Sequence, residues 1–250
     1  MRAVLRRALA AWIRHPRELA LANGAFMLAL ALPLLLLRLA PTALRLPGLA
    51  AWALWAWLAF SALVTLCLAI HDGQAPLLPA LRAWWSGQWP ERVGAFLAGA
   101  MALAWSVAAA AFWVKAPLSP WLGWPLLGVC GGLGLWALLG LQVSLGLAAE
   151  GGRTWREQWR MAALLPLAFL PQVLGTAVAF LGLSGAPVLL VGLHHWSAPL
   201  LLAPLMLSTV FTAATAALYL GLLVRSLLER ARGQDPSPAP TWRELWNPWR

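Results

Sequence analysis

Six long apolar runs alternate with short polar segments along the chain. The runs cover residues 19–37, 49–70, 93–114, 125–149, 161–183 and 198–224. About 20 apolar residues in an α-helix, at ~1.5 Å each, match the ~30 Å hydrocarbon core of a bilayer. The pattern therefore predicts an all-α, polytopic integral membrane protein with six transmembrane helices.

Shorter amphipathic segments precede the odd-numbered runs. Residues 1–14, MRAVLRRALAAWIR, place apolar side chains at helical spacing with most arginines opposite, and residues 74–89 form a similar Leu/Trp stripe. Such segments are typical of helices that lie in the membrane interface. Pro16 and Glu18 suit the first turn of the next helix. We expect an interfacial helix over 1–15, a six-span domain over 16–230, and a flexible, Pro-rich tail over 231–250 that ends in a Trp patch.

Composition supports a membrane location, and the distribution of charge predicts the orientation. The 250 residues are 62% hydrophobic and only 10% charged, which is too little polar surface for a water-soluble globule of this size. The net charge is +10, and fifteen of the eighteen basic residues fall on one side of the six-span arrangement. By the positive-inside rule that side is cytoplasmic, and it holds both termini. The basic charge therefore predicts contact with anionic lipid headgroups and not with nucleic acid.

Candidate chemistry is sparse. All eight acidic residues fall on the predicted cytoplasmic side or at its rim, so the spans offer no carriers for a proton relay. His194 and His195 lack the spacing and carboxylate partners of a zinc site, and neither a P-loop nor a G-x-S-x-G motif is present. Cys67 and Cys130 fall inside predicted spans as small core residues. We expect no catalytic, cofactor-binding or metal site, and a non-enzymatic role.

Polar and small residues inside the spans form two patterns. Ser208, Thr212, Thr215 and Tyr219 share one face of the sixth predicted helix. This stripe either lines a polar groove or makes the helix–helix hydrogen bonds that are common for Ser and Thr in membranes. Gly128 and Gly132 form a GxxxG pair in the fourth run, which favours close helix packing.

A tryptophan pair four residues apart occurs three times on the predicted cytoplasmic side. The stretches are TWREQWR at 154–160, TWRELW at 241–246 and WSGQW at 85–89, and the i, i+4 spacing puts both rings on one helical face. Interfacial tryptophans suit membrane headgroups, but no span follows the tail copy. The candidate partner contacts, made to another protein or to a second copy of the chain, are Trp155, Trp159, Trp242, Trp246 and Trp249.

The chain resembles the YesL-like family of bacterial six-helix membrane proteins of unknown function. The resemblance rests on Asn23 and Pro33 in the first run, PTA at 41–43, the basic aromatic segment 81–92 and VRSLLER at 224–230. Genes of this family often lie beside carbohydrate ABC-transporter genes. The resemblance implies the bacterial inner membrane and an accessory or component role in transport, with carbohydrate uptake as one candidate.

Two other functions stay open. Residues 148–166, AAEGGRTWREQWRMAALLP, are similar to the cytoplasmic coupling loop of ABC-importer permeases, which implies a permease that couples to its ATPase through 150–166. In that reading the acidic residue follows the alanines and the isoleucine is absent. The other alternative is a membrane enzyme that acts on a lipid or isoprenoid substrate through His71, Asp72 and Arg82 at the inner rim.

Overall fold

The computed structural model describes residues 2–39, 41–73, 77–86, 89–116, 119–150, 154–178 and 198–234. Its helices are α1 (Arg2–Arg14), α2 (Pro16–Leu39), α3 (Thr42–His71), α4 (Leu77–Ser86), α5 (Trp89–Lys115), α6 (Pro120–Glu150), α7 (Trp155–Ala168) and α9 (Ala198–Ala231). A further helix, Leu170–Val178, follows α7. These segments contain no strand, so the all-α class is confirmed.

Prolines mark the beginnings of three long helices. Pro16 and Pro120 are the first residues of α2 and α6, and Pro90 is the second residue of α5. A proline is tolerated in the first turn because the backbone N–H it lacks has no partner inside the helix. Glu18 and Glu91 add a favourable charge at the positive end of the helix dipole.

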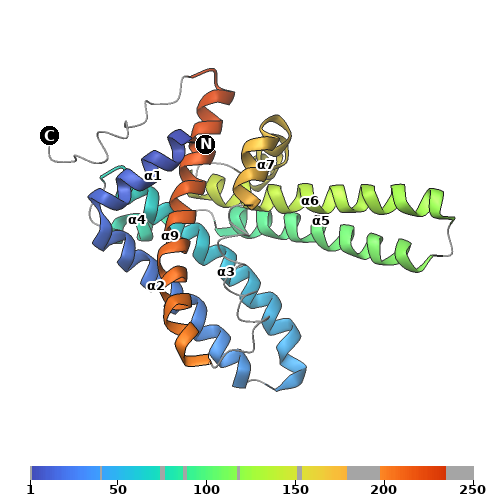
Figure 1. Cartoon of the computed structure of the whole chain (residues 1–250), viewed down its shortest axis with the longest axis horizontal. Helices are drawn as coiled ribbons and strands as arrows, with labels where there is room; N and C mark the ends of the chain where they lie inside the picture. The colour runs from blue at the N-terminus through green and yellow to red at the C-terminus, as the bar shows by residue number, and fades with distance from the viewer. Residues whose placement is uncertain are drawn as a thin grey trace.

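The helices form two groups that meet near the end of α6 (Figure 1). The first group is α2, α3 and α9, which run side by side, with α1 packed against α9. The second group is an antiparallel hairpin of α5 and α6, which extends away from the first group, with α7 packed across its base. Among the described helices, the hairpin therefore contacts the others at one end.

The core lies where the two groups meet. Leu63 and Val64 of α3, Val143 of α6 and Leu218 of α9 are each at most 1% exposed. Two glycines allow the close approach: a Cβ added at Gly146 would lie 2.5 Å from Cγ2 of Val224, and one at Gly221 would lie 2.9 Å from Cγ of Leu68. By contrast, nothing lies within 4 Å of the corresponding positions at Gly128 and Gly132. The expected packing role of the GxxxG pair is therefore not met by the described part of the chain.

Large apolar side chains cover the outside of the long helices. On the hairpin alone, Met101, Trp105, Phe112, Trp121 and Trp124 are between 65% and 90% exposed. Within the described residues, three helices (α3, α5 and α6) are long and apolar enough to cross a membrane, or up to four if α7 and Leu170–Val178 together make one bent span. The structure is thus compatible with insertion into a bilayer.

The fifth apolar run differs from a straight helix. The axes of α7 and Leu170–Val178 meet at 96°. At the bend Phe169 has φ −130° and ψ 38°, and its N–H still donates to the Leu165 carbonyl. Pro171 has no N–H to bond the Leu167 carbonyl, and its ring crowds that carbonyl, so the helix ends and a new one begins. Residues 179–183 of this run lie outside the described chain.

The N-terminal segment is helical, as expected, and one of its faces is buried. Val4, Ala8 and Ala11 of α1 are at most 5% exposed, while Leu5 and Leu9 are about 40% exposed. Half of the apolar stripe therefore packs on the chain's own helices, and half faces outward.

Candidate functional site

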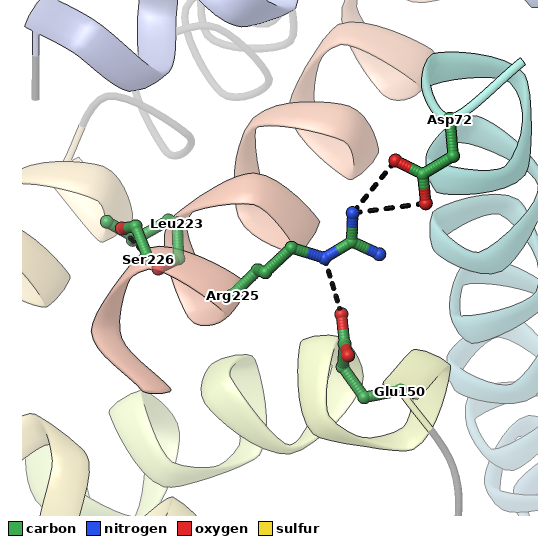
Figure 2. A network of polar contacts seen from close by, with 5 residues as sticks. All are labelled: Asp72, Glu150, Leu223, Arg225 and Ser226. Carbon is green, nitrogen blue, oxygen red and sulfur yellow. Dashed lines mark hydrogen bonds and ion pairs between the residues drawn. The ribbon is translucent and has the colours of Figure 1, made fainter. Parts of the chain in front are cut away.

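Arg225 joins the ends of three helices through a cluster of polar contacts (Figure 2). Its Nη1 donates to Asp72 Oδ1 at 2.9 Å and to Oδ2 at 3.1 Å, and its Nε donates to Glu150 Oε1 at 3.0 Å. Asp72 follows the last residue of α3, and Glu150 is the last residue of α6. On the same helix, Ser226 points away from this cluster and donates to the Leu223 carbonyl at 2.8 Å.

The charges of the Arg225 cluster depend on one another. A carboxylate at the C-terminal end of a helix is unfavourable because the free carbonyls there carry a partial negative charge. Asp72 and Glu150 both sit at such ends, and the Arg225 guanidinium offsets both. Burial alone would lower the pKa of Arg225, but its hydrogen bonds to Asp72 and Glu150 outweigh burial and raise that pKa. The guanidinium therefore stays charged and holds the ends of α3, α6 and α9 together.

The rim residues His71, Asp72 and Arg82 do not form one hydrogen-bonded group in the described part of the chain. Both oxygens of the Asp72 carboxylate accept from Arg225, and no hydrogen bond joins His71 to Asp72 or Arg82 among the described residues. Arg82 instead lies on α4, beside a cleft between α2 and α3. In the described residues the Asp72 carboxylate is therefore engaged by Arg225 and not by His71.

The first turn of α7 carries a reciprocal cap. The Glu157 N–H donates to Thr154 Oγ1 at 3.3 Å, and the Thr154 N–H donates to Glu157 Oε2 at 3.1 Å. This capping box satisfies two backbone groups that would otherwise lack partners. The T-x-x-E spacing is visible in the sequence and would have located the start of α7. The same spacing returns at Thr241 and Glu244, which lie outside the described residues.

The two tryptophans of α7 lie in different environments. Trp155 is 41% exposed, and the Arg156 guanidinium lies 5.4 Å from the centroid of its ring. Trp159 is half-buried between the hairpin helices: a Cβ added at Gly99 would lie 2.8 Å from its Cζ3, and one at Gly140 would lie 3.4 Å from its Cη2. Of the two, Trp155 therefore offers the more accessible ring to a partner.

Hydrogen bonds hold the rest of α7 on the hairpin. The Gln158 amide is buried and donates to the Ser144 carbonyl at 3.0 Å, and Trp136 Nε1 donates to the Ala163 carbonyl at 2.9 Å. Both bonds join α6 to α7, so the helix presents only its first turn and one face to the outside.

Three tryptophans gather where α4 meets α5. The ring of Trp89 lies 5.4 Å from that of Trp84 and 5.1 Å from that of Trp85, both edge-on. Trp84 is buried and donates from Nε1 to Ser61 Oγ at 3.3 Å. Arg92 donates to the Trp84 carbonyl and lies 4.8 Å from the Trp84 ring. A basic group at the C-terminal end of α4 suits the helix dipole, and it fixes α4 against α3 and α5.

Two members of the polar stripe on α9 contact other helices. Thr215 Oγ1 accepts from Trp12 Nε1 of α1 at 2.9 Å, and Tyr219 shares a side-chain hydrogen bond with Thr176. Nearby, the Ala214 N–H donates to Oδ1 of the fully buried Asn23 at 3.0 Å. These hydrogen bonds join neighbouring helices, as the second interpretation of the polar stripe expects. The side chains of Ser208 and Thr212 lie outside the described part of the chain.

The remaining sequence candidates fall partly outside the structure. Trp242, Trp246, Trp249, His194 and His195 are not among the described residues. Cys67 and Cys130 are buried and free, as expected of core residues. In the described segments, no three His, Cys, Asp or Glu side chains gather where they could hold a metal ion.

No protein-family model, curated protein or solved structure matches the chain. The resemblance to the YesL-like family therefore stays a prediction from the sequence.

Proposed function

We propose that this chain is a non-enzymatic, six-span protein of the bacterial cytoplasmic membrane that serves as an accessory or component of a membrane transport system. Carbohydrate uptake is the first candidate, because of the resemblance to the YesL-like family. In this proposal both termini are cytoplasmic, and the chain contacts a protein partner, or a second copy, at the cytoplasmic surface.

The Arg225 cluster supports the proposed topology. If six helices cross a bilayer and both termini are cytoplasmic, the second, fourth and sixth spans all end on the cytoplasmic side. In the structure the corresponding ends of α3 and α6 and the C-terminal part of α9 meet at Arg225. The ion pairs at Asp72 and Glu150 are about one-third and one-quarter exposed, which suits the aqueous rim better than the hydrocarbon core.

The exposed first turn of α7 is the observation that carries the partner contact. Thr154 is four residues after Glu150, so the turn lies within about 15 Å of the Arg225 cluster at ~3.6 Å per residue. It presents Trp155 with Arg156 against its ring. Trp and Arg are the side chains most enriched among residues that dominate protein interfaces. Because Trp159, Gln158 and Trp136 anchor the rest of α7, this turn is presented on a rigid support.

The test is affinity purification after mild extraction from the membrane. We expect the wild-type chain to recover a defined transport protein and the Trp155→Ala variant to lose it, with unchanged thermal unfolding in detergent. Trp105→Ala is the matched control, because Trp105 is 79% exposed on the hairpin, far from the proposed contact. Recovery of the wild-type chain alone, or equal loss of partner in both variants, would contradict the proposal.

A permease subunit is the second candidate, because residues 148–166 resemble the coupling loop of ABC importers and α7 is a separate helix, set at 96° to the helix that follows it. It requires α7 to project into the cytoplasm, and α7 lying flat in the headgroups would exclude it. This candidate predicts that the recovered partner is an ATPase whose turnover depends on the chain and falls with Trp155→Ala. Recovery of a partner without ATPase activity would contradict the permease candidate and would favour the accessory role.

A further inference from the structure

A cleft of about 490 Å³ opens between α2, α3 and the short helix α4. This volume is within the range of about 300–1,000 Å³ that is usual for small-molecule sites. Five alanines, from two helices, make the space: Ala22, Ala25 and Ala29 on α2, and Ala59 and Ala62 on α3. Larger side chains at these positions would close the gap between the two helices.

The walls of the cleft are held in place by hydrogen bonds. Trp55 lines the cleft, and its Nε1 donates to the Ala29 carbonyl at 2.8 Å. One turn away, Trp52 Nε1 donates to the Leu30 carbonyl at 3.2 Å. These two bonds set the spacing of α2 and α3. On the third side, Trp84 is fixed by Ser61 of α3 and by Arg92, and these contacts hold α4 as the third wall.

The lining is apolar except for one basic side chain. Among the described residues that line the cleft Arg82 is the one charged side chain, and the others are Ala, Leu, Phe and Trp. Its side chain is exposed and makes no hydrogen bond or ion pair within the described chain. Leu78, Leu81 and Trp85, all from the same helix, surround it with exposed apolar surface. The cleft therefore suits an elongated apolar group with an anionic end.

The length of the cleft matches one leaflet of a membrane. On α3 it runs from Trp55 to Leu66, which is roughly 16 Å at ~1.5 Å per residue. Half of the ~30 Å hydrocarbon core, the depth of one acyl chain, is about 15 Å. Arg82 lies on α4, the helix that follows the end of α3 at Asp72 along the chain. In the proposed topology that end of α3 is cytoplasmic, so the headgroup of a lipid bound at Arg82 belongs to the cytoplasmic leaflet.

From these observations we infer that the cleft binds one acyl chain of an anionic glycerophospholipid, with the lipid phosphate at Arg82. This inference depends on the membrane insertion proposed above, but it does not depend on the proposed transport role. A bilayer supplies this ligand at the mouth of the cleft, and the exposed side chains of Trp85 and Arg82 favour a headgroup there. In this arrangement α4, with Trp84 and Trp85, covers the bound acyl chain and holds it against α2 and α3.

Native mass spectrometry of the purified protein in detergent tests the inference. The probes are a phosphatidylglycerol and a phosphatidylcholine with identical acyl chains, and a free fatty acid of the same chain length. We expect the phosphatidylglycerol to be retained in preference to both. Arg82→Ala should lower its retention about fivefold, the equivalent of ~1 kcal/mol for one basic residue at an anionic surface. Arg232→Ala, which removes an exposed arginine beyond α9, should leave retention unchanged.

A second variant tests the site by filling the cleft with a larger side chain. Ala25→Phe places a ring in the space from the α2 side and should abolish retention, whereas Leu28→Phe, at a position 73% exposed and outside the cleft, should not. Equal retention of phosphatidylcholine, preferred retention of the fatty acid, or full retention by Ala25→Phe or Arg82→Ala would each overturn the inference. Alkaline extraction of the wild-type membranes reports on membrane insertion separately, so failure of the topology is not confused with failure of the lipid site.

Discussion

Arg225 and Gly99 illustrate how single residues decide contacts between distant helices. Arg225 forms ion pairs with two carboxylates at adjacent helix ends, and Gly99 leaves the space that Leu141 and Trp159 occupy. Each residue is unremarkable in the sequence, because an arginine after a span and a glycine inside one are common in membrane proteins. Their roles follow from partners that are 42 to 153 residues away along the chain.

Removing the Arg225 side chain should destabilise the junction of α3, α6 and α9. Arg225→Ala leaves Asp72 and Glu150 facing each other at the negative ends of two helices. Because the pairs are partly exposed, we expect a loss of about 1–2 kcal/mol in the free energy of unfolding. Thermal unfolding in detergent measures this loss, and Arg232→Ala, at an exposed position beyond α9, is the control. Equal unfolding temperatures for the two variants would contradict the role given to Arg225.

Substitution of Gly99 should be costly, whereas substitution of Gly128 should not. A Cβ at Gly99 would lie 2.5 Å from Cδ2 of Leu141 and 2.8 Å from Cζ3 of Trp159. Gly99→Ala should therefore lower the free energy of unfolding by about 1–3 kcal/mol through overpacking. Nothing lies within 4 Å of the same position at Gly128, so Gly128→Ala should be neutral or slightly stabilising. A loss at Gly128 as large as at Gly99 would instead indicate that the GxxxG face has a partner.

At the scale of elements, α7 combines a local start signal with tertiary anchoring. The Thr154–Glu157 capping box sets where the helix begins, and Gln158, Trp159 and Trp136 fix it to the α5–α6 hairpin. The bend after Ala168 then turns the chain by 96°. A short amphipathic helix of 14 residues would be marginal alone, so its stability comes from the hairpin.

The capping box gives a prediction about the first turn of α7. Thr154→Ala removes the oxygen that accepts from the Glu157 N–H and should cost about 1 kcal/mol. Hydrogen exchange should show faster exchange at the amides of the first turn and unchanged exchange in α6. Glu157→Gln keeps an acceptor for the Thr154 N–H and is the matched control. Unchanged exchange in Thr154→Ala would contradict the cap.

At the scale of the whole molecule, the two helix groups share one junction. The hairpin diverges from α2, α3 and α9 beyond this junction (Figure 1). Its large apolar side chains Trp105, Phe112, Trp121 and Trp124 are exposed. Helices cross a bilayer within about 40° of its normal. If all six proposed spans cross one bilayer, we therefore expect the hairpin to lie closer to parallel with the other helices there.

Cysteine labelling tests this arrangement. In a background with Cys67 and Cys130 replaced by Ala, single cysteines at Thr42, Ser119 and Gln234 use positions that are exposed in the structure. A membrane-impermeant reagent added to intact cells should label Thr42→Cys and Ser119→Cys, and label Gln234→Cys only after the membrane is opened. Labelling of Ser119→Cys only from the inside would place the hairpin tip in the cytoplasm and exclude the six-span topology.

The helical class, the start of α2 at Pro16 and the apolar central parts of α3, α5 and α6 were predicted from the sequence, whereas the observed starts of α3, α5 and α6 lie four to seven residues earlier than the predicted runs. They depend on local properties: apolar run length, proline in the first turn, and acidic residues at helix starts. The runs at 49–70, 93–114 and 125–149 each fall within one observed helix. Other local signals, such as the Thr154–Glu157 cap, were present in the sequence but missed.

Only the tertiary structure decided which helices meet and which polar groups find partners. Nothing in the local pattern pairs Arg225 with Asp72 and Glu150, places Trp159 beside Gly99, or gathers five alanines of two helices into a cleft beside Arg82. The length of an apolar run indicates whether a helix can lie in hydrocarbon, but it does not indicate which face of that helix packs against a neighbour. Which face meets which neighbour depends on small residues and hydrogen bonds between segments far apart in the chain, and these are defined only when the helices pack.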